Sequence, residues 1–177
     1  LPLAEVEPKL KMGVLLGDPG SGKTEWCKRR VRFGLTPVIE QLRLGKIGSA
    51  AVAIPLYVYL PHVARAIADE AKLIATLVER RCVSSGLAVL DPARRLAAAI
   101  LVAALEDSES ALPPGLAPWL WERLAGGALA AETMLLCLDA WDEVRAQRGA
   151  VAAAIRSLAD QGKLRLIISS RIVGYSG

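Results

Sequence analysis

The sequence predicts an α/β fold in three layers, α/β/α, with a mostly parallel sheet between the helices. Short apolar runs of strand length recur along the 177 residues, and longer segments with apolar residues at helical spacing separate them. A glycine-rich turn joins the first of these strands to the first helix. With 53% apolar residues, the chain can bury one sizeable core and is expected to form a single domain.

The first strand is predicted as a short buried run at residues 12–16, and the first helix at residues 25–34. Between them GDPGSGKT, residues 17–24, satisfies the spacing G-x-x-x-x-G-K-[ST] in the strand–turn–helix context that this motif requires. Its glycines let successive backbone N–H groups face inward, in front of the positive end of the helix. This stretch predicts a phosphate-binding loop. The alternative is a glycine-rich turn that binds nothing.

The residue types in this loop suit a nucleotide with its metal ion. Lys23 would reach the outer phosphates, and the Thr24 hydroxyl would bind Mg²⁺. We predict that the nucleotide is bound by Gly17, Asp18, Pro19, Gly20, Ser21, Gly22, Lys23, Thr24 and Glu25.

The middle of the chain predicts one strand and several helices. Residues 35–49 contain Pro37 and have weak periodicity, which favours a connection. Residues 51–60, AVAIPLYVYL, predict a strand, and because Pro55 cannot donate to a ladder, this strand should lie at a sheet edge or begin after Pro55. Helices are expected at residues 62–83, 92–105 and 119–124.

A cluster of carboxylates follows the next strand, predicted at residues 133–138. If this strand lies parallel to the first, Asp139 is delivered close to Thr24, where it can hold Mg²⁺ or a water ligand of the ion. Asp142 and Glu143 follow within reach of an attacking water, and Asp142 is the favoured candidate to orient it. The alternative is a solvated acidic loop with an ordinary helix cap.

Polar residues also follow the last predicted strand, residues 164–168, which comes after a helix at 144–161. The carboxyl ends of parallel strands meet at one edge of a sheet, so Ser169, Ser170 and Arg171 should emerge beside the outermost phosphate. Arg171 could sense that phosphate, although polar tips after buried strands are common.

Composition and charge exclude several classes of protein. No apolar run approaches the ~20 residues that a membrane-spanning helix needs, and residues 1–11 lack the features of a secretory signal, so a cytoplasmic protein is expected. The cysteines, Cys27, Cys82 and Cys137, show no metal-ligand spacing and are expected as reduced, buried thiols. The net charge of +4 is spread along helices with little aromatic interleaving, which favours solvated helix faces over a nucleic-acid surface.

Three segments resemble the NACHT branch of the STAND signalling ATPases, which includes Nod-like receptors and bacterial anti-phage relatives. They are GDPGSGKT at residues 17–24, LLCLDAWDEV at 135–144 and LRLIISSRIVGY at 164–175. The middle segment is the most specific, because the family signature is a magnesium-binding Asp, a tiny residue and then an acidic pair. IPLYVYLPHVA at 54–64 also resembles the family's strand leading into a helix.

This resemblance implies a P-loop NTPase core over residues 1–177 that is incomplete at its C-terminus. The implied sheet order is 2-3-4-1, with the fifth strand missing from this fragment. The separation of Lys23 from Asp139 is long for this branch, so residues 84–127 are a candidate helical insertion. The resemblance implies ATP or ADP with Mg²⁺, held by Thr24 and Asp139, and catalytic roles for Asp142, Glu143 and Arg171.

The leading functional hypothesis is an ATP-driven switch that hydrolyses slowly and controls self-association of a larger immune-type or regulatory protein with further effector and sensor domains. ATP rather than GTP follows from the resemblance, and no N-K-x-D guanine-reading segment is present. One alternative is a nucleotide-binding scaffold that does not hydrolyse. Another is an AAA+ motor. The residue after Asp139 argues against it, because Ala140 occupies the position at which such motors usually carry Glu.

Overall fold

The computed structural model describes residues 12–44, 54–85, 89–106, 115–125, 134–161 and 165–172. The chain divides into two compact units, and each is made of more than one segment of the chain. The first comprises residues 1–59, 130–143 and 162–177, and the second comprises residues 60–129 and 144–161. Within the described ranges, no helix combines the length and apolarity needed to cross a membrane.

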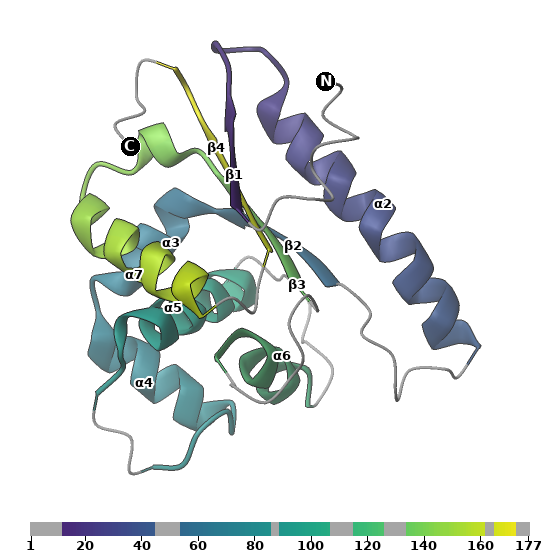
Figure 1. The fold of residues 1–177 in the computed structure, drawn as a ribbon. Coiled ribbons are helices and arrows are strands. Elements are labelled where there is room, and N and C mark those ends of the chain that lie inside the picture. The colour runs from purple at the N-terminus through teal and green to yellow at the C-terminus, as the bar shows by residue number, and fades with distance from the viewer. Residues whose placement is uncertain are drawn as a thin grey trace. The chain divides into compact units, whose positions relative to one another are not determined.

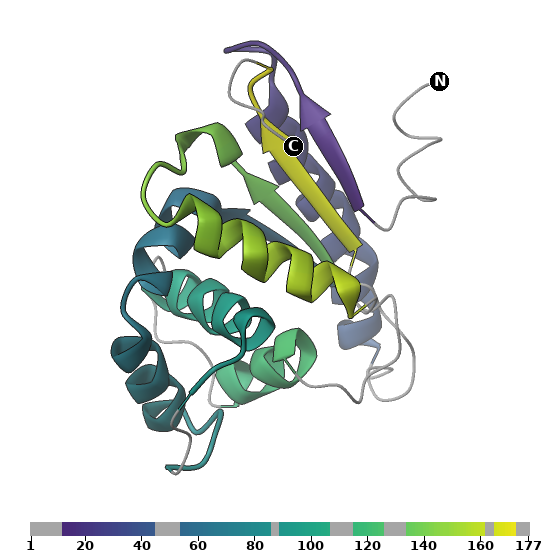
Figure 2. The same cartoon turned by 60° about the vertical axis from the view of Figure 1, so that its left-hand side comes forward.

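The first unit contains a parallel sheet built from β1 (Met12–Leu16), β2 (Ile54–Tyr59), β3 (Met134–Asp139) and β4 (Arg165–Ser170). Its order is β1-β4-β3-β2, which is the predicted order 2-3-4-1 counted from the other edge. All pairings are parallel, and the arrows of β1, β4 and β3 run side by side in one direction in Figure 2. The prediction of an α/β fold with a parallel sheet is confirmed.

The core of this unit lies between the sheet and helix α2 (Lys23–Arg43), which runs along β2 and β3 (Figure 1). Every residue of β3 is buried, as its continuous apolar sequence predicts for a central strand. Cys27 of α2 packs with Leu135, Cys137 and Ile167, and all four are buried. This cluster anchors the start of α2 to the two central strands.

Helix α2 is longer than the sequence predicts. It continues through Pro37 to Arg43, over residues that were expected to form a connection. A proline inside a helix removes one backbone hydrogen bond, and the residues beyond Pro37 whose burial is described are exposed. Nearer its start, α2 packs on β2. Gly34 permits the close packing, because a Cβ at this position would lie 2.8 Å from Cγ of Pro55.

The two edge strands behave differently. β2 pairs only with β3 among the described strands, so the prediction that Pro55 belongs to an edge strand is confirmed. β1 was predicted to be buried, and that prediction is wrong: Met12, Val14 and Leu16 are 50%, 37% and 43% exposed. These side chains alternate with half-buried residues, because β1 is the opposite edge of the described sheet.

The second unit is helical. Its central helix is α5 (Pro92–Glu106), which contacts the other four: α3 (Leu60–Ile67), α4 (Glu70–Glu79), α6 (Leu116–Ala125) and α7 (Arg148–Asp160). The prediction of a single helix at residues 62–83 is wrong, because α3 ends at Ile67 and Asp69 caps a second helix, α4, by accepting the N–H of Lys72 at 2.9 Å. Arg95 of α5 forms an ion pair with Glu70 of α4. The Glu70 carboxylate also accepts a hydrogen bond from the N–H of Leu90 at 3.0 Å.

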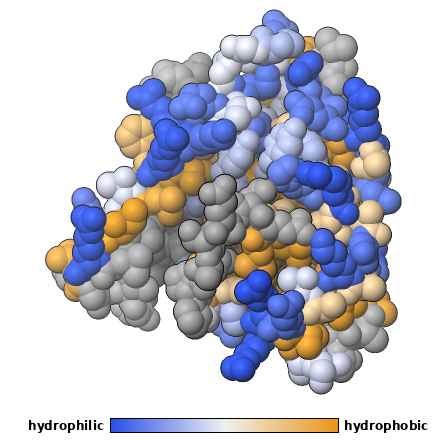
Figure 3. Space-filling view, turned by 180° about the vertical axis from the view of Figure 1, so that it is seen from behind, coloured by the Kyte–Doolittle hydropathy of each residue, from blue (hydrophilic) through white to orange (hydrophobic). Residues whose placement is uncertain are grey.

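The outward side of α2 is basic, with Lys28, Arg29 and Arg32 exposed. Apolar residues interrupt this basic side: Phe33 is 63% exposed, and the Arg29 guanidinium lies 5.4 Å from the centre of its ring. Figure 3 shows hydrophilic and hydrophobic residues interspersed over one face of the molecule.

Candidate functional site

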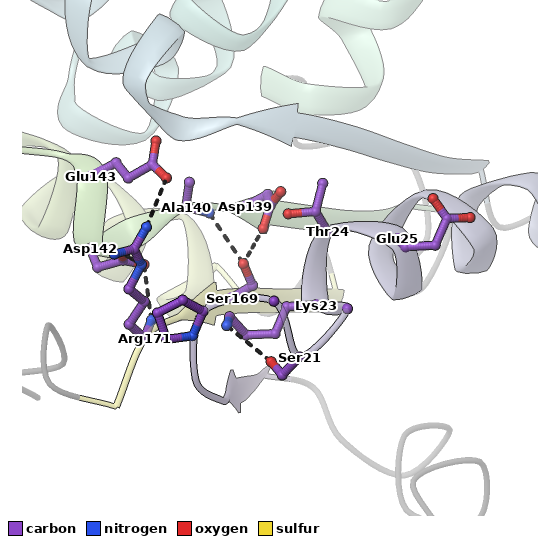
Figure 4. A pocket seen from close by; sticks show the side chains of 13 residues that line it. Ser21, Lys23, Thr24, Glu25, Asp139, Ala140, Asp142, Glu143, Ser169 and Arg171 are labelled. Carbon is purple, nitrogen blue, oxygen red and sulfur yellow. Dashed lines mark hydrogen bonds and ion pairs between the residues drawn. The ribbon is translucent and has the colours of Figure 1, made fainter.

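The carboxyl ends of the strands in the first unit open into a pocket of about 390 Å³ (Figure 4). Three segments distant in sequence form it: the glycine-rich loop after β1, the acidic segment after β3 and the end of β4. Its lining residues are Pro19, Gly20, Ser21, Gly22, Lys23, Thr24, Glu25, Asp139, Ala140, Asp142, Glu143, Ser169 and Arg171. The strand ends thus bring together most of the polar residues that the sequence singled out. Ser170 is an exception: it is buried, does not line the pocket, and its hydroxyl donates to the carbonyl of Arg171 at 3.1 Å.

The loop after β1 has the backbone conformation that its glycines allow. Gly20 and Gly22 have φ angles of 79° and 81°, which residues with a Cβ rarely adopt. The N–H of Ser21 donates to the carbonyl of Asp18 at 3.1 Å, which closes a turn, and α2 begins at Lys23. The start of a helix offers N–H groups that have no intrahelical acceptor, so the loop can receive an anion there.

The Lys23 side chain folds back over the loop. Its Nζ donates to the carbonyl oxygens of Gly17 and Asp18, at 2.6 and 2.9 Å, and to Ser21 Oγ at 3.2 Å. Gly17 and Asp18 are predicted site residues that do not line the pocket, and they contribute these carbonyl groups instead. A phosphate would therefore compete with loop oxygens for the Lys23 ammonium group.

Thr24 and Asp139, the two predicted magnesium ligands, both line the pocket. Thr24 lies in the first turn of α2, and Asp139 is the last residue of β3 and only 2% exposed. In Figure 4 the Thr24 hydroxyl oxygen is turned toward the Asp139 carboxylate. A hydroxyl and a carboxylate beside a phosphate-sized pocket are oxygen donors of the kind that Mg²⁺ prefers, so the residues present fit this ion.

Asp139 is held by both neighbouring strands. The Ser169 hydroxyl, from β4, donates to Oδ1, and the Tyr57 hydroxyl, from β2, donates to Oδ2 at 2.8 Å. Burial and the hydrogen bond to Asp139 raise the pKa of Tyr57, so its hydroxyl stays protonated and remains a donor. Sequence reasoning placed Ser169 near the site without this role, and it missed Tyr57 altogether.

The turn after β3 positions the acidic pair. Ala140 has a φ of 64°, in the left-handed region, and its N–H donates to Ser169 Oγ at 3.2 Å. The chain then forms a 3-10 turn, η2 (Trp141–Glu143), closed by the N–H of Glu143 donating to the carbonyl of Ala140 at 3.1 Å. This turn is why the predicted helix at 144–161 begins only at Arg148.

Asp142 and Arg171 form a two-point contact. The Arg171 backbone N–H donates to Asp142 Oδ1 at 2.9 Å, and Arg171 Nε lies 3.0 Å from Oδ2. The Asp142 side chain is 10% exposed and that of Arg171 is 51% exposed. Arg171 also approaches Glu143, at 4.0 Å. The three residues predicted to be catalytic are therefore adjacent, and Arg171 engages both oxygens of Asp142.

Comparison of the chain with protein-family models, curated proteins and solved structures found no match.

The arrangement combines three chemical capacities. Backbone N–H groups and Lys23 can neutralise an anion, Thr24 and Asp139 can hold a divalent cation beside it, and Asp142 with Arg171 can hold a water or an anionic oxygen. Tyr59, which the sequence did not single out, donates its hydroxyl to Glu143 Oε2 at 2.5 Å. In the sequence, the sign of this role is that Tyr57 and Tyr59 are two residues apart on one predicted strand, so their side chains share one face of the sheet.

Proposed function

We propose that this chain is an ATP-binding and slowly hydrolysing signalling switch module, a P-loop NTPase core of the NACHT kind in a three-layer α/β/α arrangement. The observation that carries the proposal is that the motif loop, Thr24 and Asp139 line one pocket. Buried carboxylates are rare, so Asp139, which is 2% exposed at the end of a central strand and lines the same pocket as the loop, argues against a glycine-rich turn that binds nothing.

In the proposed reaction, transfer of a phosphate to water, the residues of the pocket would have separate roles. Loop N–H groups would cradle the phosphates, and Lys23 would exchange its loop acceptors for phosphate oxygens. Thr24 and Asp139 would hold Mg²⁺, which supplies charge neutralisation between the outer phosphates. Asp142 would orient the attacking water once Arg171 turns from this carboxylate toward the outermost phosphate.

The resemblance of the three motif segments supports the biological part of the proposal. It favours ATP over GTP and a role in controlling the oligomerisation of a larger immune-type or regulatory protein. In that role the bound nucleotide biases two conformations, and slow hydrolysis sets how long the active one persists.

The direct test is Lys23→Ala, with ATP affinity measured by calorimetry in the presence of Mg²⁺. Loss of the ammonium group should abolish detectable ATP binding. Arg32→Ala is the matched control, because Arg32 is exposed on α2 and its removal makes the same change in net charge. Equal affinities of Lys23→Ala and the unaltered protein would refute the proposal.

A nucleotide-binding scaffold that does not hydrolyse is the second candidate. It is favoured by the Arg171 contact with both oxygens of Asp142, which would keep this carboxylate from water if it persisted with ATP bound. Phosphate release separates the two candidates. Release that disappears in Asp142→Ala while ATP stays bound supports the switch that hydrolyses, and ATP binding without release by the unaltered protein supports the scaffold.

A further inference from the structure

Two tyrosines of β2 reach the acidic side chains of the candidate site. The Tyr57 hydroxyl donates to Asp139 Oδ2 at 2.8 Å, and the Tyr59 hydroxyl donates to Glu143 Oε2 at 2.5 Å. Neither tyrosine lines the pocket. Residues two apart on a strand share one face, so β2 donates a hydrogen bond to each of two different carboxylates.

The Asp139 carboxylate is constrained from two sides. Tyr57 comes from β2 and Ser169 from β4, and these strands flank β3 in the sheet. Each hydroxyl occupies one acceptor position on a different carboxylate oxygen, whereas an ionised carboxylate has about four. The two donors leave further acceptor positions on Asp139, which lines the pocket, and they restrict rotation of its carboxylate about the Cβ–Cγ bond.

Tyr57 is itself well anchored. Its ring packs against the buried cluster of Cys27, Leu135, Cys137 and Ile167. Lys28 Nζ of α2 lies over the ring, 5.5 Å from its centre. A ring fixed by packing presents its hydroxyl with little loss of side-chain entropy, which is what a group that orients a metal ligand requires.

We propose that Tyr57 is a positioning residue that sets the affinity of the site for Mg²⁺ by orienting Asp139, whereas Tyr59 orients Glu143 and leaves the metal untouched. This inference rests on the proposed nucleotide site and identifies how its metal ligand is controlled. Partners that orient a metal ligand typically change metal affinity by 10- to 100-fold when they are removed.

The test compares Tyr57→Phe with Tyr59→Phe, each of which removes one hydroxyl from the same strand. The affinity of a fluorescent ATP analogue is measured for each purified protein in excess Mg²⁺ and in excess EDTA. The readout is the ratio of these two affinities. We expect Tyr57→Phe to lower the ratio by roughly tenfold through a loss in the Mg²⁺ arm alone, and Tyr59→Phe to leave it unchanged.

The ratio keeps the test valid if a variant is partly unfolded, because an unfolded fraction reduces the active protein equally in both arms. An unchanged ratio in Tyr57→Phe, or an equal fall in both variants, would overturn the inference while ATP binding by the unaltered protein still stood. ATP binding that is insensitive to Mg²⁺ in the unaltered protein would also overturn it. Failure of the unaltered protein to bind the analogue in either arm would overturn the proposed function as well.

Discussion

Arg171 is the residue whose present contacts and proposed role differ most. It binds both oxygens of Asp142, a side chain only 10% exposed, and half of its own side chain is open to solvent. Arg171 lines the same pocket as the glycine-rich loop, so its guanidinium can exchange the Asp142 carboxylate for a phosphate bound in that pocket. The pair is therefore suited to respond to the number of phosphates bound.

This geometry predicts the behaviour of Arg171→Ala. The variant should bind MgATP with little change, because in the proposed site Lys23 and the loop would supply most of the phosphate contacts. Phosphate release should fall by roughly 10²-fold, the typical cost of losing one donor aimed at developing charge. Single-turnover measurements with saturating ATP test this, with Arg145→Ala as a control at another exposed arginine. Unchanged turnover would show that Arg171 serves only to hold the 3-10 turn.

At the scale of elements, the contact between α2 and β2 decides where the helix lies. Glycine inside a helix usually costs stability relative to alanine, so its presence at position 34 needs a reason. The reason is the approach of Pro55, whose Cγ would be 2.8 Å from a Cβ at that position. Pro55 in turn is tolerated because β2 is an edge of the described sheet.

Gly34→Ala should therefore destabilise the protein, opposite in sign to the usual effect of this substitution in a helix. We expect a loss of about 1–3 kcal/mol in the free energy of unfolding, the typical cost of overpacking. Urea denaturation measures it. The double variant Gly34→Ala/Pro55→Ala removes the opposing ring and should recover most of the loss. A single variant as stable as the parent would mean that α2 does not approach β2 this closely.

At the scale of the whole molecule, the chain passes between its two units several times, so the first unit is assembled from distant segments. The reactivity of the buried thiols can be used to probe that assembly. Cys27 and Cys137 are 0% exposed and meet in the cluster beneath the candidate site, whereas Cys82 is half-buried. The side-chain hydrogen bond with Cys137 and burial raise the pKa of Cys27, and burial raises the pKa of Cys82.

A raised pKa keeps a thiol neutral to higher pH, so these cysteines should react with iodoacetamide at pH 8 more slowly than a free thiol. Mass spectrometry after short labelling should find Cys82 modified first, and Cys27 and Cys137 modified only through opening of the first unit. MgATP at 100 times its dissociation constant should suppress that opening by up to about 100-fold, and this protection should be lost in Lys23→Ala. Early labelling of Cys27 would contradict the packing of α2 on the sheet.

The sequence by itself determined the elements whose signals are local. The glycine-rich loop, the continuous apolar run of β3 and the acidic residues after it depend on residue type and short spacing, and parallel strands necessarily bring their carboxyl ends to one edge. The edge position of β2 was predicted from Pro55 and the strand order was implied by the resemblance of the motif segments, and the sheet has both.

Only the tertiary structure decided the contacts between segments distant in the chain. The continuation of α2 through Pro37 runs against the local signal of the proline, and the exposure of β1 depends on its place at the edge of the described sheet. The hydroxyl of Tyr57 meets Asp139 because of the register of β2 on β3, which pairs Tyr57 with Cys137 and Tyr59 with Asp139. Both β2 and β3 are continuously apolar, so no alternation of polar and apolar residues marks their register in the sequence, and side chains that meet only after the sheet has formed select it.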